Sequence, residues 1–142
     1  MKAALFIAIA LGLLAPSVPP PSADAAGRYD GSAPLVCAAV SVAECEAEGR
    51  CQQRTPAGVN LPSLFKVDLT TMKLRNLHAE TGQQGKESSI RNVDHTHSKM
   101  ILSGADGERG WSVLIHETTG KMSATVTGDG EGFVIFGQCA LP

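Results

Sequence analysis

Hydrophobic and polar residues alternate along most of the chain beyond residue 64. The runs FKVDL, WSVLIH and MSATV show this clearly, because every second side chain in them is apolar. Successive side chains of a β-strand point to opposite faces, so a period of two predicts strands with one buried and one solvated face. The side chains expected on buried faces include Phe65, Val67, Leu69, Trp111, Val113, Ile115, Met122, Ala124 and Val126.

Two further segments lack this simple alternation. The run GFVIFGQC places Phe133, Ile135 and Cys139 on one face and Val134 and Phe136 on the other, which predicts a strand buried on both sides. The segment 37–49, CAAVSVAECEAEG, contains alanines and glutamates that allow a short helix ending at its glycine. Its two valines favour a strand instead, and we expect the strand.

Short polar or glycine-bearing sequences separate the apolar runs. ETTGKM, GDGEG and GADGERG supply residues that tolerate positive φ in hairpin turns, and Gly82–Glu87 is expected to form a flexible loop. The similarity of VDLTTMKL to IHETTGKM indicates one hairpin design used twice. Together these patterns predict an all-β fold of about seven to nine short antiparallel strands. The strands would form an up-and-down meander, closed as a small barrel or folded as a sandwich.

The N-terminus has the three parts of a secretory signal peptide. Lys2 provides a positive charge, residues 3–15 form an apolar run, and Ala23-Asp24-Ala25 is a small-x-small cleavage motif. The apolar run is shorter than the roughly 20 residues of a membrane-spanning helix. We therefore expect residues 1–25 to be removed after Ala25, and the mature protein to be periplasmic or secreted with no membrane span.

The mature chain has the length of a single small domain. Residues 26–34 are rich in glycine and serine and are expected to form a flexible arm before one β domain over residues 35–142. Twelve basic residues against fourteen acidic ones give a net charge of −2, without a basic cluster, which makes nucleic acid an improbable partner. We expect a monomer.

Four cysteines, Cys37, Cys45, Cys51 and Cys139, would reach an oxidising compartment and form two disulfides, for which three pairings exist. The short polar loop between Cys45 and Cys51 favours a bond between them, which leaves Cys37 to pair with Cys139. In the chain-entropy account the small loop is worth roughly 2–3 kcal/mol and the large one roughly 4–5 kcal/mol. A zinc site is disfavoured because no C-x₂-C pair is present.

The segment VDHTHSKM raises the question of a metal site. In a strand, His95 and His97 would lie on one face, and His116 or His78 could add a third ligand. However, the polar interval Asp94–Lys99 has the length and composition of a hairpin connection. We expect a solvated turn with His97 at its tip, and no cofactor.

Motifs for other chemistry are absent from the sequence. It contains no G-x-S-x-G elbow, and no cysteine is expected to remain free as a nucleophile. Asp68, Asp94, Glu117 and Asp129 lie in or beside turns, where a solvated carboxylate is the ordinary outcome. GDGEG lacks the helix and lysine of a phosphate loop, and its ligand count is below that of a calcium site.

The chain resembles a group of small exported proteins of Gram-negative bacteria. The resemblance is carried by VNLPSLFKVDL, by the cysteine placing and by the ending GDGEGFVIFGQC. The group is uncharacterised, so the resemblance implies location and shape and no activity. We therefore expect a non-enzymatic envelope scaffold that binds a protein, peptide or small ligand. The alternatives are a metal-binding protein that uses His95 and His97, and a small hydrolase with a carboxylate pair.

Overall fold

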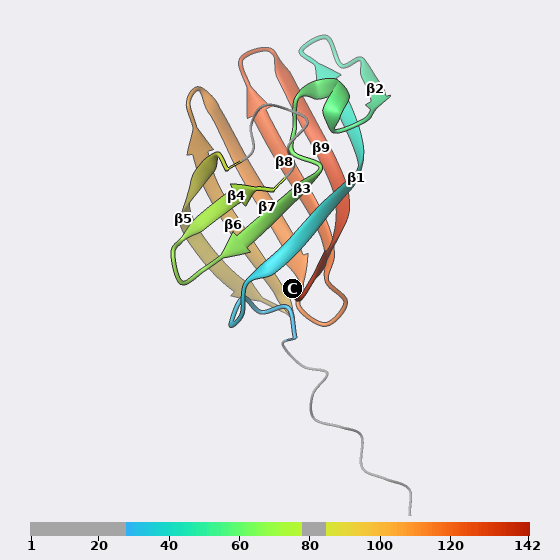
Figure 1. Ribbon diagram of the computed structural model, residues 1–142. Helices are drawn as coiled ribbons and strands as arrows, with labels where there is room; N and C mark the ends of the chain where they lie inside the picture. The colour runs from blue at the N-terminus through green and yellow to red at the C-terminus, as the bar shows by residue number, and fades with distance from the viewer. Residues whose placement is uncertain (1–27, 78–84) are drawn as a thin grey trace, which may run out of the picture.

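The computed structural model describes residues 28–77 and 85–142 (Figure 1). The predicted signal peptide, His78 and residues 82–84 of the predicted Gly82–Glu87 loop lie outside this part of the chain. Within it, the backbone forms nine strands and a short 3-10 helix (Ala57–Val59). The strands are β1 (Leu35–Glu46), β2 (Cys51–Arg54), β3 (Leu64–Asp68), β4 (Lys73–Asn76), β5 (Glu87–Thr96), β6 (Lys99–Asp106), β7 (Arg109–His116), β8 (Lys121–Gly128) and β9 (Glu131–Ala140).

Eight of these strands close into a barrel. From β3 to β9 each strand pairs antiparallel with the next in sequence, and β1 pairs with both β3 and β9. The ninth strand, β2, continues β1 as a hairpin beside the barrel. The predicted all-β meander is confirmed, and of the two predicted closures the structure shows the barrel rather than the sandwich. Segment 37–49 lies mainly in β1, as expected. An open sheet would leave unpaired backbone N–H and C=O groups along its two edge strands. Closure pairs these groups, which favours the barrel over an open sheet.

Side chains that alternate along the strands fill the barrel interior. The buried set contains the inward-facing residues predicted from the sequence, with Leu69 and Val126 partly buried at its margin. The remaining buried apolar residues are Leu35, Cys37, Val42, Leu61, Ile90, Met100, Leu102, Phe133, Ile135 and Cys139. The apolar residues that recur at every second position of the strands thus all face the inside of the barrel and form one core.

The prediction that β9 is buried on both sides is wrong. Phe133, Ile135 and Cys139 point into the core, but Val134 is 36% exposed and Phe136 is 53% exposed. In a single barrel each strand has only one inner face, and no second layer in the described residues covers the outside. The outer apolar residues of β9 therefore face solvent in the isolated chain.

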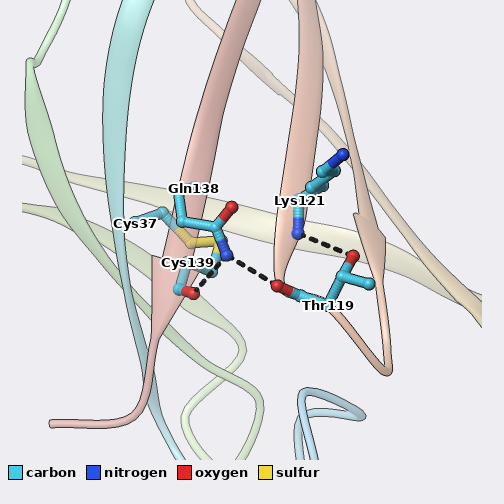
Figure 2. The surroundings of a disulfide bond; sticks show 5 residues. All are labelled: Cys37, Thr119, Lys121, Gln138 and Cys139. Carbon is cyan, nitrogen blue, oxygen red and sulfur yellow. Dashed lines mark hydrogen bonds between the residues drawn. A yellow bond between two sulfur atoms is a disulfide. The ribbon is translucent and has the colours of Figure 1, made fainter.

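Both predicted disulfides are present. Cys37 is bonded to Cys139 and joins β1 to β9, whereas Cys45 is bonded to Cys51 and closes the β1–β2 hairpin. Figure 2 shows the first bond with Gln138 beside it, whose Nε2 donates to the carbonyl of Thr119 over 2.7 Å. This contact ties β9 to the β7–β8 turn next to the disulfide.

The two ends of the barrel are built differently. The end near the C-terminus is filled by Leu35, Met100, Leu102 and Ile115, all 0% exposed. The segment 28–34 lies against this closed end (Figure 1), where the N–H of Tyr29 donates to Glu117 O over 2.9 Å and Tyr29 packs against the core. The opposite end, which carries the β6–β7 and β8–β9 turns, contains a cavity.

Candidate functional site

The cavity at the open end of the barrel has a volume of about 570 Å³. Its inner part is apolar and is formed by alternate residues of the barrel strands with Leu61 from the loop after the 3-10 helix. These residues are Leu61, Phe65, Trp111, Val113, Ala124 and Ile135. The volume falls in the range of cavities that hold small molecules, which are mostly lined by apolar and aromatic side chains.

Trp111 dominates this lining, and its position depends on a glycine in the neighbouring strand. Gly104 pairs with Trp111, and a Cβ at Gly104 would lie 2.4 Å from Cζ2 of the indole and 2.5 Å from Ser89 O. The β5 strand has a bulge where Ile90 pairs with Gly104, before pairing resumes at Asn92. The missing side chain and the bulge therefore make room for the indole inside the barrel.

The indole Nε1 of Trp111 is buried and has no hydrogen-bond partner among the described residues. A buried donor left unsatisfied costs about 1–3 kcal/mol. The wall of the cavity thus contains a polar group that is held at a cost to stability.

Polar groups of the site gather at the mouth of the cavity. Asn60, Arg75, Lys86, Glu87, Asp106 and Arg109 line it there, together with the buried side chain of Asn76. Polar groups at one end and apolar walls at the other make the site amphipathic.

Contacts between side chains of different strands fix several of these rim groups. Arg75 Nη2 lies 2.6 Å from Glu87 Oε1, and the Ser88 hydroxyl donates to Asp106 Oδ2 over 2.9 Å. Arg109 is ion-paired with Glu131, and its guanidinium carbon lies 5.6 Å from the centre of the Phe133 ring. The rim is therefore ordered around the opening by cross-strand pairs.

The three histidines of the described residues, His95, His97 and His116, do not converge on one point. His97 and Ser98 form the tip of the β5–β6 hairpin with φ of +47° and +60°, which confirms His97 at the tip of a turn. Asp94 and His95 lie in β5 rather than in the connection.

Each of these three histidines has its own polar neighbour. His95 Nδ1 lies 2.7 Å from Glu117 Oε1, His97 Nδ1 2.9 Å from Thr96 Oγ1, and His116 Nδ1 2.9 Å from Thr118 Oγ1. No set of three His, Cys, Asp or Glu side chains in residues 28–77 and 85–142 is arranged to hold a metal ion.

The carboxylates named from the sequence do not line the cavity. Asp68 Oδ1 accepts from Thr70 N and Thr71 N in the β3–β4 turn, and Asp129 lies in the β8–β9 turn. The carboxylates that line the cavity are Glu87 and Asp106, which the sequence did not single out. They could have been found only from their position at strand ends next to inward-facing residues.

Comparison with known proteins adds no functional assignment. No protein-family model matches the chain, and no curated protein matches it. Within the described residues, no helix has the length and apolar character needed to cross a bilayer.

Proposed function

We propose that this protein is an exported, non-enzymatic carrier or sensor that binds one small, largely apolar ligand in the open end of the barrel. The observation that supports this most directly is the cavity of about 570 Å³, apolar inside and polar at its mouth. A barrel of eight strands is just wide enough to hold one small ligand between its walls. Two disulfides are compatible with the oxidising compartment to which a signal peptide would deliver the chain.

The chemistry of the lining defines the ligand class. The rings of Trp111 and Phe65 and the aliphatic groups of Val113 and Ile135 suit an aliphatic or aromatic body. The arginines and amides of the rim suit a polar or anionic group that stays near solvent. We therefore expect an amphiphile that enters with its apolar part first.

Titration with anilinonaphthalene sulfonate tests this proposal, because the probe combines an apolar aromatic body with an anionic group. Trp111 is the sole tryptophan of the chain and reports on the cavity directly. We expect saturable quenching of Trp111 emission with one probe per chain, together with enhanced probe fluorescence.

Ala124→Phe is the informative variant. Ala124 is 7% exposed and lines the cavity, so a phenyl ring there would occupy the ligand space. Ala105→Phe on the outside of β6 is the matched control, since Ala105 is exposed. We expect Ala124→Phe to weaken probe binding at least tenfold and Ala105→Phe to leave it unchanged. Equal binding by both variants and the wild type would exclude the cavity as the site.

A further inference from the structure

A loop at the open end contributes to the cavity without belonging to the barrel sheet. Asn60, Leu61 and Pro62 line the cavity from the connection between β2 and β3, which also contains the 3-10 helix (Figure 1). Nearly all the other lining residues lie in paired strands. The loop is therefore the largest part of the lining that can move without breaking the sheet.

Residues 55–62 of this loop are hydrogen-bonded only to one another within the described part of the chain. Leu61 N donates to Pro56 O over 2.9 Å, and Gly58 N donates to Thr55 Oγ1 over 3.1 Å. Because these bonds are internal, the segment can tilt as one body and keep all of them. A paired strand has no such freedom, since each step away from its neighbour breaks backbone hydrogen bonds.

Both ends of the segment are fixed to the barrel. Arg54, immediately before it, pairs with Val42 of β1, and the second disulfide fastens β2 to β1. Immediately after it, Ser63 O accepts from Ala39 N over 2.9 Å. The segment can therefore tilt away from the cavity but cannot detach from the barrel.

Apolar side chains hold the segment in place. Leu61 is 8% exposed within the core, Pro56 is buried, and Val59 is partly buried against the core. Contacts of this kind have no preferred direction, so they can be released and formed again. A tilt that exposes one leucine side chain should leave the open form at about 1–10% of molecules.

We propose that residues 55–62 form a lid on the cavity and that the side chain of Leu61 keeps this lid closed. A ligand would enter when Leu61 withdraws and would be enclosed when Leu61 returns. Lids of this kind control how fast a ligand enters and leaves its site. The inference rests on the proposed ligand binding, but it concerns the rates of binding and not the existence of the site.

Rapid mixing of the mature protein with anilinonaphthalene sulfonate, followed through Trp111 emission, tests the lid. Leu61→Ala weakens closure, so the open form should become about tenfold more populated. The association and dissociation rate constants should therefore both rise about tenfold.

Leu74→Ala is the matched control for this measurement. Leu74 also lines the cavity, but it lies in β4, which is paired with both β3 and β5. The variant loses the same apolar volume from the lining without loosening the lid. Its association rate should stay within about twofold of the wild type, and only its dissociation should change.

Acrylamide quenching of Trp111 tests the lid without any ligand. Trp111 is 9% exposed, so more frequent opening should raise the quenching constant severalfold in Leu61→Ala and leave it nearly unchanged in Leu74→Ala. That quenching result without probe binding would support the lid and overturn the proposed ligand binding. Saturable probe binding with equal association rates and equal quenching in both variants would overturn the lid and leave ligand binding in place. Far-ultraviolet dichroism verifies that both variants are folded.

Discussion

The closed and the open end of this barrel are made from the same strands but are packed differently. At the closed end the side chains of Met100, Leu102 and Ile115 are fully buried. At the open end the same strands contribute Gly104, Trp111 and Ala124 around a cavity. A single strand thus contributes a fully buried residue at one end and a residue beside the cavity at the other.

This difference in packing implies that the two ends contribute unequally to the free energy of unfolding. The closed end combines full burial with the disulfide that spans 102 residues of sequence. The open end contains a cavity, an unsatisfied indole N–H among the described residues and a rim of exposed ion pairs, which contribute little to stability. The closed end should therefore contribute more to the free energy of unfolding than the end that contains the cavity.

The largest expected effect concerns the two disulfides. Replacing Cys37 and Cys139 by alanine should lower the free energy of unfolding by about 4–5 kcal/mol, because it frees a loop of 102 residues in the unfolded chain. Replacing Cys45 and Cys51 should cost only about 2–3 kcal/mol for a separation of 6 residues. Guanidinium unfolding of the two double variants gives both values. Equal losses would refute the view that the closed end is the main brace.

Two leucines provide a matched comparison of packing. Leu102 at the closed end is 0% exposed, and Leu102→Ala should cost about 3–5 kcal/mol through a new void. Leu61 is 8% exposed but borders the existing cavity, so Leu61→Ala should cost about 1–2 kcal/mol.

Urea unfolding compares the two leucine variants, and probe titration should show altered binding for Leu61→Ala alone. If Leu61→Ala proves the more costly change, the open end is packed as tightly as the closed one.

A smaller effect separates the two similar hairpins at the closed end. Gly120 in the β7–β8 turn has φ of +69°, and a Cβ there would lie 2.5 Å from Cys139 O. Gly120→Ala should therefore destabilise the fold by about 1–3 kcal/mol. Met72 in the β3–β4 turn has φ of +54°, so Met72→Gly should be neutral or stabilising by up to about 1 kcal/mol. Thermal unfolding measures both, and a destabilised Met72→Gly protein would contradict the assigned strain.

The smallest effect is pH-dependent. The Ser32 hydroxyl and backbone N–H donate to the carboxylate of Asp30, which lowers its pKa below the ordinary value. A carboxyl with a lowered pKa stabilises the fold above its ordinary pKa, and this contribution disappears as pH falls through the lowered pKa. Asp30→Asn should thus lower the melting temperature slightly at neutral pH and leave it unchanged near pH 2. A difference that persisted at low pH would exclude charge as the cause.

The strands could be predicted because their signal is local. Trp111, Val113 and Ile115 alternate with polar neighbours or with Leu114, and hairpin residues such as Gly120 mark the turns. The disulfide pairing could also be predicted, because the short loop between Cys45 and Cys51 favours a bond between them and leaves Cys139 as the partner of Cys37. The outer face of β9 was mispredicted because Phe136 is as apolar as Phe133, and the sequence does not reveal how many layers surround a strand.

The cavity was harder to predict from the sequence. Trp111 was interpreted mainly as core, and the structure places it both in the core and on the wall of the cavity. The polar residues at its mouth include Glu87, Asp106 and Arg109. They lie at strand ends, where the sequence looks like that of any solvent-exposed turn. Pairing of the consecutive strands β5, β6 and β7 places them at the same end of the barrel, and this placement depends on strand register rather than on any local motif.

The class of the fold, the order of the strands and the pairing of the cysteines follow from local sequence features, since period-two patterning, turn residues and loop length act over a few neighbouring residues. The tertiary structure alone decided that the sheet closes, that one end is filled and the other hollow, and that Phe136 lies outside. These outcomes depend on the summed volumes of side chains from eight strands and on their register around the cylinder, which no short stretch of sequence contains.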